Sequence, residues 1–180
     1  MKKGVIIAIS AAAVLVIAAC VLFLTGVLKL PFQKKEAAKE TPYMYVEYMD
    51  TCMLIDKAGN VIGSTQEPPT DIPKINGISF STIIIGEPLV ASNEDAYAYA
   101  KKIVDSLNKN ALFMNEVYVS SDLEATMYIN SVRILLGSDN KTEDKIHDLR
   151  DFYEDVKDLS GTLDMQELSH NNSGYSLKPN

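Results

Sequence analysis

The chain has 180 residues, nearly half of them hydrophobic (47%), and its formal net charge is −7. This acidic balance argues against binding to nucleic acid or lying flat on anionic lipid, because like charges repel. Cys20 lies in an apolar N-terminal run and Cys52 is the sole cysteine after it, which excludes a disulfide within the remaining domain. That remainder is long enough to bury its own hydrophobic core.

The first predicted element is a transmembrane helix over Gly4–Leu28, an uncharged apolar run that ends at Lys29. A helix of this length reaches about 37 Å, which exceeds the hydrocarbon core of about 30 Å. Basic residues flank both ends of the run, so charge alone leaves the orientation open. A three-residue tail before a long domain is the common signal-anchor arrangement, and an exported domain is expected mainly from the family resemblance described below. We therefore expect a cytoplasmic tail over residues 1–3, a membrane anchor over 4–28, a charged linker over 29–42 and an extracytoplasmic domain over 43–180.

Lipidation of Cys20 is an alternative way to anchor the domain. The sequence Ile17-Ala18-Ala19-Cys20 resembles the bacterial lipobox, in which the cysteine is acylated after cleavage. Lipoprotein cysteines are normally followed by polar residues, whereas Val21–Leu24 continues the apolar run. The uncleaved transmembrane anchor is our expectation, and either anchor holds the domain at a membrane lipid surface.

The first part of the domain reads as short strands. Tyr43–Tyr48 is rich in aromatic and β-branched residues, and Cys52–Asp56 with Val61–Ile62 predicts a hairpin with glycine in its turn. The prolines of Glu67–Pro73 predict an extended connector outside the sheet. The apolar run Thr82–Gly86 predicts a buried strand.

A helix is predicted from about Glu94 to Asn108. Ser92 and Asp95 have the spacing of a capping box at its start. Because residues two apart on a helix do not share a face, we expect one of Tyr97 and Tyr99 to be buried and the other exposed. The apolar face is predicted to hold Tyr97, Ala100, Ile103, Val104 and Leu107.

The second half predicts an antiparallel meander, a helix and a final strand. The three meander strands are expected at 116–119, 125–129 and 132–136. Asn140 with Glu143 is a capping pattern for the helix, and Gly161 follows its end. Period-two alternation makes Thr162–Leu168 the last clear strand, before a short piece at Tyr175–Leu177. The apolar face of the helix is predicted to hold Ile146, Leu149, Phe152, Tyr153, Val156 and Leu159.

Catalytic and metal-binding motifs are missing from the sequence. His147 falls on the polar face of an acidic helix and His170 in a polar turn, and neither has a sequence signature beside it. No glycine-rich phosphate loop or paired-cysteine zinc motif is present. The sequence therefore predicts no catalytic centre, and no metal or cofactor is expected.

The order of the segments resembles the C-terminal β domain of the bacterial cell-division protein FtsQ, called DivIB in Gram-positive bacteria. The resemblance covers about Tyr43 to Leu177, and rests on Leu54–Ile62, Pro73–Gly77, Val132–Gly137, the helix after it, and Gly161–Met165. It implies a single-span protein of the cell membrane that scaffolds the division complex, or divisome, at the septum by binding the partners FtsL and FtsB (DivIC). Family members also carry a small POTRA domain between the span and the β domain, and here only the short linker occupies that place.

The partner-binding surface implied by the resemblance is the last strand of the sheet. A strand at a sheet edge has unpaired backbone groups that a partner strand can complete. An alternative is that these residues only close the domain's own sheet. The candidate partner-binding residues are Thr162, Leu163, Asp164, Met165, Gln166, Glu167, Leu168, Tyr175 and Leu177.

The predicted fold class is α+β, with a predominantly antiparallel sheet and two packed helices behind one N-terminal transmembrane helix. The predicted function is a membrane-anchored, non-enzymatic scaffold that binds its partners by strand addition. The alternative function is a surface lipoprotein or membrane-tethered domain that binds a cell-wall or other small ligand.

Overall fold

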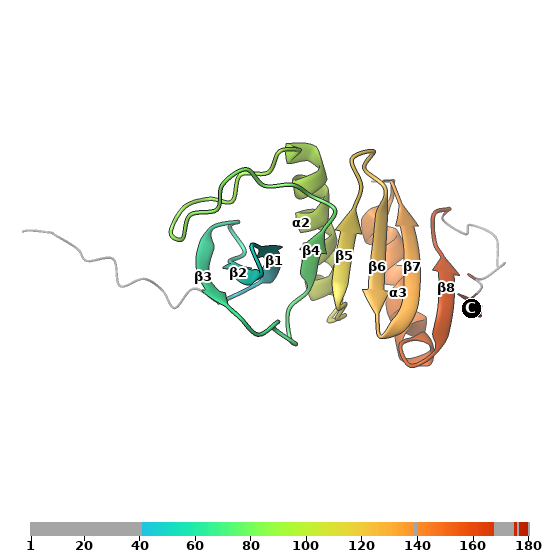
Figure 1. The fold of residues 1–180 in the computed structure, drawn as a ribbon. Coiled ribbons are helices and arrows are strands. Elements are labelled where there is room, and N and C mark those ends of the chain that lie inside the picture. Colours follow the sequence, from blue (N-terminus) through green and yellow to red (C-terminus); the bar gives the residue numbers. More distant parts are fainter. Residues whose placement is uncertain (1–40, 139, 168–174, 176, 180) are drawn as a thin grey trace, which may run out of the picture. The chain divides into compact units, whose positions relative to one another are not determined.

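The strands of the domain form one mixed, mostly antiparallel sheet, with two helices on one of its faces (Figure 1). The computed structural model describes residues 41–138, 140–167, 175 and 177–179, and over these residues the strand order is β3-β2-β1-β4-β5-β6-β7-β8-β9. The predicted α+β class is confirmed. The expected tail, membrane anchor and first part of the linker lie outside the described residues, as does Cys20. Among the described helices, none has the length and apolar character needed to cross a bilayer.

The first three strands pair in chain order and confirm the predicted hairpin. They are β1 (Met44–Tyr48), β2 (Thr51–Ile55) and β3 (Val61–Thr65), and β3 is longer than expected. Asp56 holds the turn between β2 and β3, because its Oδ1 accepts hydrogen bonds from the backbone N–H groups of Gly59 and Asn60 at 2.8 and 2.7 Å. Burial alone would raise the pKa of the Asp56 carboxyl, but hydrogen bonds from Asn60 and the turn backbone outweigh it and lower that pKa.

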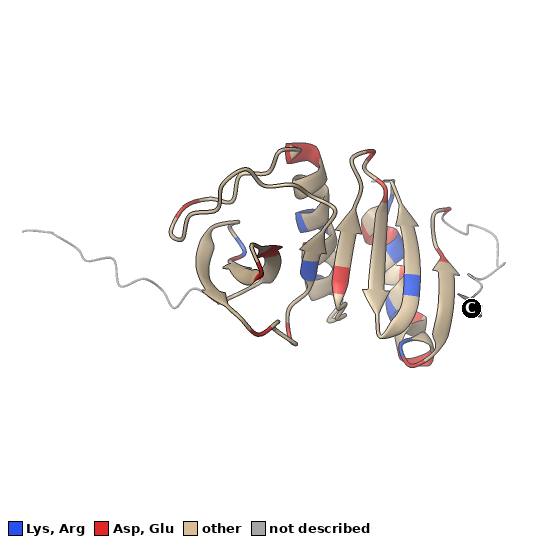
Figure 2. Ribbon diagram, viewed as in Figure 1, with Lys and Arg blue, Asp and Glu red and all other residues tan. Residues whose placement is uncertain are grey.

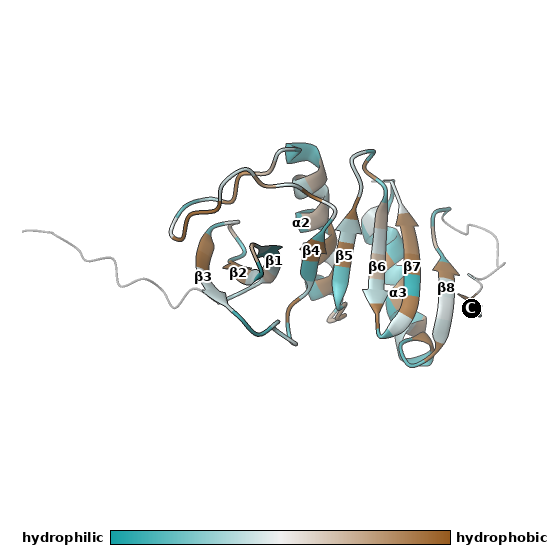
Figure 3. Ribbon diagram, in the orientation of Figure 1, coloured by the Kyte–Doolittle hydropathy of each residue, from teal (hydrophilic) through white to brown (hydrophobic). Residues whose placement is uncertain are grey.

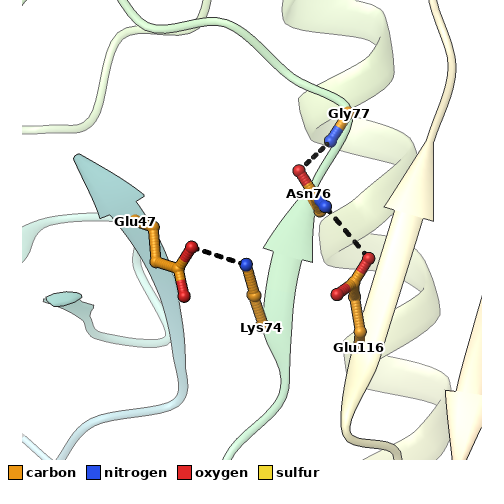
Figure 4. Close-up of polar contacts among 5 residues, drawn as sticks. All are labelled: Glu47, Lys74, Asn76, Gly77 and Glu116. Atoms are coloured by element: carbon orange, nitrogen blue, oxygen red, sulfur yellow. Dashed lines mark hydrogen bonds and ion pairs between the residues drawn. The ribbon is translucent and has the colours of Figure 1, made fainter. Parts of the chain in front are cut away.

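The short strand β4 (Lys74–Asn76) joins the two halves of the sheet, since it lies parallel to both β1 and β5. Polar side chains link the three strands on the helix-free face (Figure 4). Lys74 Nζ lies 2.6 Å from Glu47 Oε2, and Asn76 Nδ2 donates to Glu116 Oε1 at 3.0 Å. Gly77 has φ +83°, and a Cβ there would collide with the Val119 carbonyl and the Tyr118 ring.

The predicted meander is confirmed, as β5 (Glu116–Val119), β6 (Ala125–Ile129) and β7 (Ser131–Gly137) pair antiparallel in sequence order. Alternate residues of these strands are buried under the helices. Strands β5 and β7 each carry one charged residue, Glu116 and Arg133, of opposite sign, and β6 carries none (Figure 2). The helix-free face is therefore a mixed polar surface, as expected for an antiparallel sheet with one solvated side.

Both predicted helices are present, as α2 (Glu94–Lys109) and α3 (Thr142–Val156), but both predicted caps are wrong. The cap of α2 is Asn93, whose side chain accepts a hydrogen bond from the Ala96 N–H at 3.1 Å. Lys141 precedes α3 in a left-handed conformation with no side-chain cap, so Asn140 does not cap that helix.

The predicted apolar faces of the helices are confirmed in part. On α2, Tyr99 is the buried ring, with 3% of its surface exposed, while Tyr97 is only partly buried. On α3, Ile146 and Leu149 are fully buried, whereas Leu159 follows the helix and is 47% exposed.

The prediction of a buried strand at Thr82–Gly86 is wrong. Ile84 and Ile85 are 57% and 56% exposed, and the segment belongs to a loop between β4 and α2. The segment lies outside the sheet because β4 already has a partner strand on each side, which leaves no position beside β4.

Candidate partner-binding edge

Strand β8 (Ser160–Asp164) lies beside β7 and parallel to it. The pairing is parallel because α3 forms the crossover connection between the two strands. Leu163 is 1% exposed and Met165 is fully buried, and the Met165 N–H donates to the Leu135 carbonyl at 2.8 Å. The strand predicted over Thr162–Leu168 thus begins two residues earlier and ends at Asp164.

The outer strand at this end of the sheet is β9 (Leu177–Lys178), which pairs antiparallel with β8. Thr162 pairs with Lys178 and Leu163 with Leu177. The expectation that β8 itself is the exposed last strand is therefore wrong over these two residues, which have neighbours on both sides. Within the described residues, the strand at this end of the sheet is β9.

Gly161 permits the close approach of this last segment to β8. Its φ is +150°, and a Cβ at this position would lie 2.5 Å from the Lys178 carbonyl oxygen. A side chain here would push the last segment outward, so glycine is required for the observed contact. The sequence pattern identified Gly161 only as a helix breaker.

Tyr175 fastens the segment before β9 to α3. Its hydroxyl donates to Asp148 Oδ2 at 3.1 Å, and its ring lies 5.8 Å from that of Phe152, centroid to centroid. Two side chains of α3 thereby hold the start of the terminal segment, which fixes the outer strand more firmly than its two paired residues would alone.

A buried cation supports the same end of the sheet. Lys145 on α3 is 1% exposed, and its Nζ donates to the Leu136 carbonyl at 2.9 Å and the Gln166 carbonyl at 2.7 Å. Burial lowers the pKa of this ammonium group, while the acidic residues Glu167 and Glu124 partly oppose the shift. The lysine ties the end of β7 to the segment after β8.

The sequence reasoning missed Lys145, although the pattern held a signal for it. Lys145, Leu149, Phe152 and Val156 recur at spacings of four, three and four residues, which places them on one helix face. A lysine on the apolar face of a helix either packs its methylene chain against apolar neighbours or hydrogen-bonds its amine inside the protein. Lys145 does both.

The predicted partner-binding residues occupy different positions at this edge. Thr162 is half-buried and Asp164 is exposed, while Gln166 and Glu167 are exposed and follow the strand. Tyr175 and Leu177 belong to the terminal segment, whereas Leu168 lies outside the described residues. Lys178, which no sequence signal singled out, completes the outer strand.

The opposite edge of the sheet is partly covered. The Val61 N–H on β3 donates to the Glu87 carbonyl at 2.9 Å, and the Val61 carbonyl accepts from the Gly86 N–H at 2.7 Å. Leu89 adds a further backbone bond to Gly59 at 2.9 Å. Over the residues that the structure describes, a loop thus occupies part of the β3 edge, while β9 ends the strand order on the other side.

No group of three or more histidine, cysteine or acidic residues within the described ranges is placed to hold a metal ion. His147 is exposed, with its Nδ1 3.4 Å from Asn110 Oδ1, and His170 lies outside the described residues.

Cavities of about 410 and 490 Å³ flank Pro42, between the proline-rich connector and its neighbours. The arrangement with the clearest chemical capability is the sheet edge, which can form main-chain hydrogen bonds.

Comparison with protein-family models and with curated proteins finds no match to this chain.

Proposed function

We propose that the chain is a single-span membrane protein whose exported domain is a non-enzymatic scaffold of the bacterial division complex. In this proposal the anchor is Gly4–Leu28, and the domain binds FtsL-type and FtsB (DivIC)-type partners by adding a strand to β9. The proposal draws on the resemblance of the segment order to the β domain of FtsQ and DivIB, and on the physical character of the sheet edge.

The observation that carries the proposal is the position of β9 at the end of the strand order. In an edge strand the N–H and C=O groups of one residue point toward the inner neighbour, and those of the next residue point away from it. A partner strand pairs with the outward groups, while side chains of alternating residues supply specificity. Tyr175 and Gly161 support this role, since they hold the terminal segment against α3 and β8.

The charges near the edge favour a partner of mixed polarity over a strongly acidic or basic one. The exposed charged residues on the last three strands include Lys178 on β9, Asp164 on β8 and Arg133 on β7. Strand addition at such an edge derives its affinity from main-chain hydrogen bonds and its register from opposite-charge pairs between strands.

The experiment compares proline and alanine at the two β9 positions in the full-length protein. Leu177→Pro and Lys178→Pro each remove one backbone donor, and one of these donors faces the partner. Leu177→Ala and Lys178→Ala keep both donors and are the matched controls. Capture of partners from solubilised membranes, identified by mass spectrometry, is expected to fall for at least one proline variant and to persist for both alanine variants.

Thermal unfolding of all four variants is the control for loss of the fold. Undiminished capture of FtsL-type and FtsB-type proteins by both proline variants, each with an unchanged melting temperature, would remove β9 as the binding edge. Capture of neither class by the wild-type protein would reject the division scaffold itself.

A further inference from the structure

The loop between β4 and α2 forms a projecting arm, which we define as Ile78–Ala91 (Figure 1, green). Its base is closed by a bridge between Phe80 and Ala91 and by a hydrogen bond from the Ser92 N–H to the Ser79 carbonyl at 2.8 Å. Its tip is a turn in which the Glu87 N–H donates to the Ile84 carbonyl at 3.2 Å. The arm is therefore a defined hairpin-like structure.

The two limbs of the arm differ in their backbone partners. The returning limb, Gly86–Leu89, bonds to Val61 at the start of β3 and to Gly59 in the turn before it. The outgoing limb, Ser81–Ile85, has no backbone hydrogen bond among the described residues except the one that closes the tip turn. The described part of the chain thus supplies no backbone partner for its other donors and acceptors.

The outgoing limb has the composition of a strand and the exposure of a loop. Four of its five residues are β-branched, which is the composition that strands favour. Ile84 is 57% exposed and Ile85 56%, and Val90 on the returning side is 57% exposed. Hydrophobic residues run along this limb (Figure 3). A run that predicts a buried strand and is left uncovered marks a surface that another chain can cover.

A pocket and a single charge define the chemistry that the arm would accept. The pocket has a volume of about 370 Å³ and is lined by Ser81, Thr82, Ile84, Glu87, Pro88 and Val90. Glu87 is the only charged residue of the arm, and it is exposed. An aliphatic side chain fits the apolar lining, and a lysine or arginine beside it would pair with the carboxylate.

We propose that the outgoing limb Ser81–Ile85 is a docking site for an extended segment of a protein partner. The segment carries aliphatic side chains and a basic residue that meets Glu87. This site lies at the β3 end of the sheet, so it is separate from the β9 edge and does not depend on the function proposed for that edge.

A bilayer is a poorer occupant of this surface than a protein strand. Insertion would place the backbone groups of Ser81–Ile85 in hydrocarbon, where neither water nor lipid tails can supply hydrogen bonds. Surface-bound segments also use lysine and arginine to meet anionic lipid, and the only charge on this arm is an acid. A protein strand supplies the missing hydrogen bonds.

The test uses a synthetic peptide, Lys-Val-Thr-Ile-Val-Ile-Thr-Lys, and hydrogen exchange of the full chain in detergent micelles. The peptide should slow amide exchange at residues 81–85 in a saturable manner. One control peptide has proline in place of the first isoleucine, and another has glutamate in place of both terminal lysines. Each should bind the protein at least about tenfold more weakly than the original peptide.

Two matched variants locate the binding site on the protein. Ile84→Lys should weaken peptide binding by about tenfold or more, because it adds a cation to the apolar surface. Leu159→Lys replaces an equally large, 47% exposed side chain elsewhere and should leave binding unchanged.

Several results would overturn the proposal. They are an absence of protection at residues 81–85 at saturating peptide, equal binding of the glutamate-flanked peptide, and equal effects of the two lysine substitutions. Protection that rises with protein concentration alone would assign the surface to a second copy. Protection that appears only in nanodiscs of phosphatidylglycerol and phosphatidylethanolamine would assign it to lipid. Either assignment would replace the protein-strand proposal.

Discussion

Tyr97 and Tyr99 lie two positions apart on α2 and differ in the partners of their hydroxyl groups. The Tyr99 hydroxyl donates to the Gly137 carbonyl at 2.8 Å. The Tyr97 hydroxyl is buried and has no hydrogen-bond partner among the described residues. A buried hydroxyl without a partner costs free energy, whereas a bonded one contributes to stability.

The matched substitutions Tyr97→Phe and Tyr99→Phe should therefore have different effects. We expect Tyr97→Phe to leave the free energy of unfolding unchanged or raise it by about 1 kcal/mol, and Tyr99→Phe to lower it by about 1–2 kcal/mol. Urea unfolding at pH 7 measures both. Equal losses in the two variants would mean that the Tyr97 hydroxyl has a partner in solution.

Tyr97 also predicts how stability depends on alkaline pH. Burial, with a smaller effect of the Asp56 carboxylate, raises the pKa of Tyr97 to about 12, above the usual value near 10 of an unfolded chain. The unfolded chain loses this proton first, so the Tyr97 contribution is intact below pH 10 and is lost as the pH rises toward 12. The Tyr97→Phe variant should lose less stability across that range than wild type, as followed by urea unfolding at successive pH values.

Lys145 provides a second test at the residue scale. Lys145→Met keeps the apolar stem but removes the amine that donates to the Leu136 and Gln166 carbonyls. We expect the free energy of unfolding to fall by about 1–3 kcal/mol. The control is Lys109→Met, because the Lys109 side chain is 67% exposed and should change stability by less than about 0.5 kcal/mol. Equal free energies of unfolding for the two variants would contradict the stabilising role of the buried amine.

At the scale of elements, Gly161 should determine whether β9 stays docked. In Gly161→Ala, the new Cβ meets the Lys178 carbonyl and the backbone keeps an unfavourable positive φ, so we expect a loss of about 1–3 kcal/mol. Gly63→Ala is the control, since a Cβ there would meet no atom within 4 Å. Faster amide exchange of β8 and β9 in Gly161→Ala alone would place the destabilisation at this end of the sheet. Equal exchange rates in the two variants would contradict this role of Gly161.

The elements that the sequence predicts well are those set by local patterns. Buried and exposed residues alternate along β5, β6 and β7, and apolar stripes run along α2 and α3. Each of these patterns arises within a single segment of the sequence. The cap of α2 was missed because Ser92 and Asn93 are adjacent and both are residue types that favour the N-cap position.

The features that sequence could not supply depend on distant segments. The run Thr82–Gly86 has the composition of a buried strand, and only the placement of β4 between β1 and β5 leaves it outside the sheet. The parallel pairing of β7 with β8 and the position of β9 outside β8 are likewise decided by long-range contacts. The outer strand of this sheet end is therefore Leu177–Lys178 and not the predicted Thr162–Leu168.

At the scale of the whole molecule, the proposed function requires export of the domain. A reporter that is active only outside the cytoplasm, fused after Asn180, should be active in cells that produce the full chain. A reporter active only in the cytoplasm, fused at the same position, is the control and should be silent. The reverse pattern in a well-expressed pair of fusions would contradict the topology and the division role together.

The most direct test of partner binding at β9 is site-specific photo-crosslinking in living cells. A photoreactive residue in place of Lys178 on the outer strand is compared with one in place of Tyr118, which is 38% exposed on β5. We predict that the probe at Lys178 crosslinks to an FtsL-type or FtsB-type protein and that the probe at Tyr118 does not. Crosslinking of such a partner at Tyr118 but not at Lys178, or at neither position, would contradict strand addition at this edge.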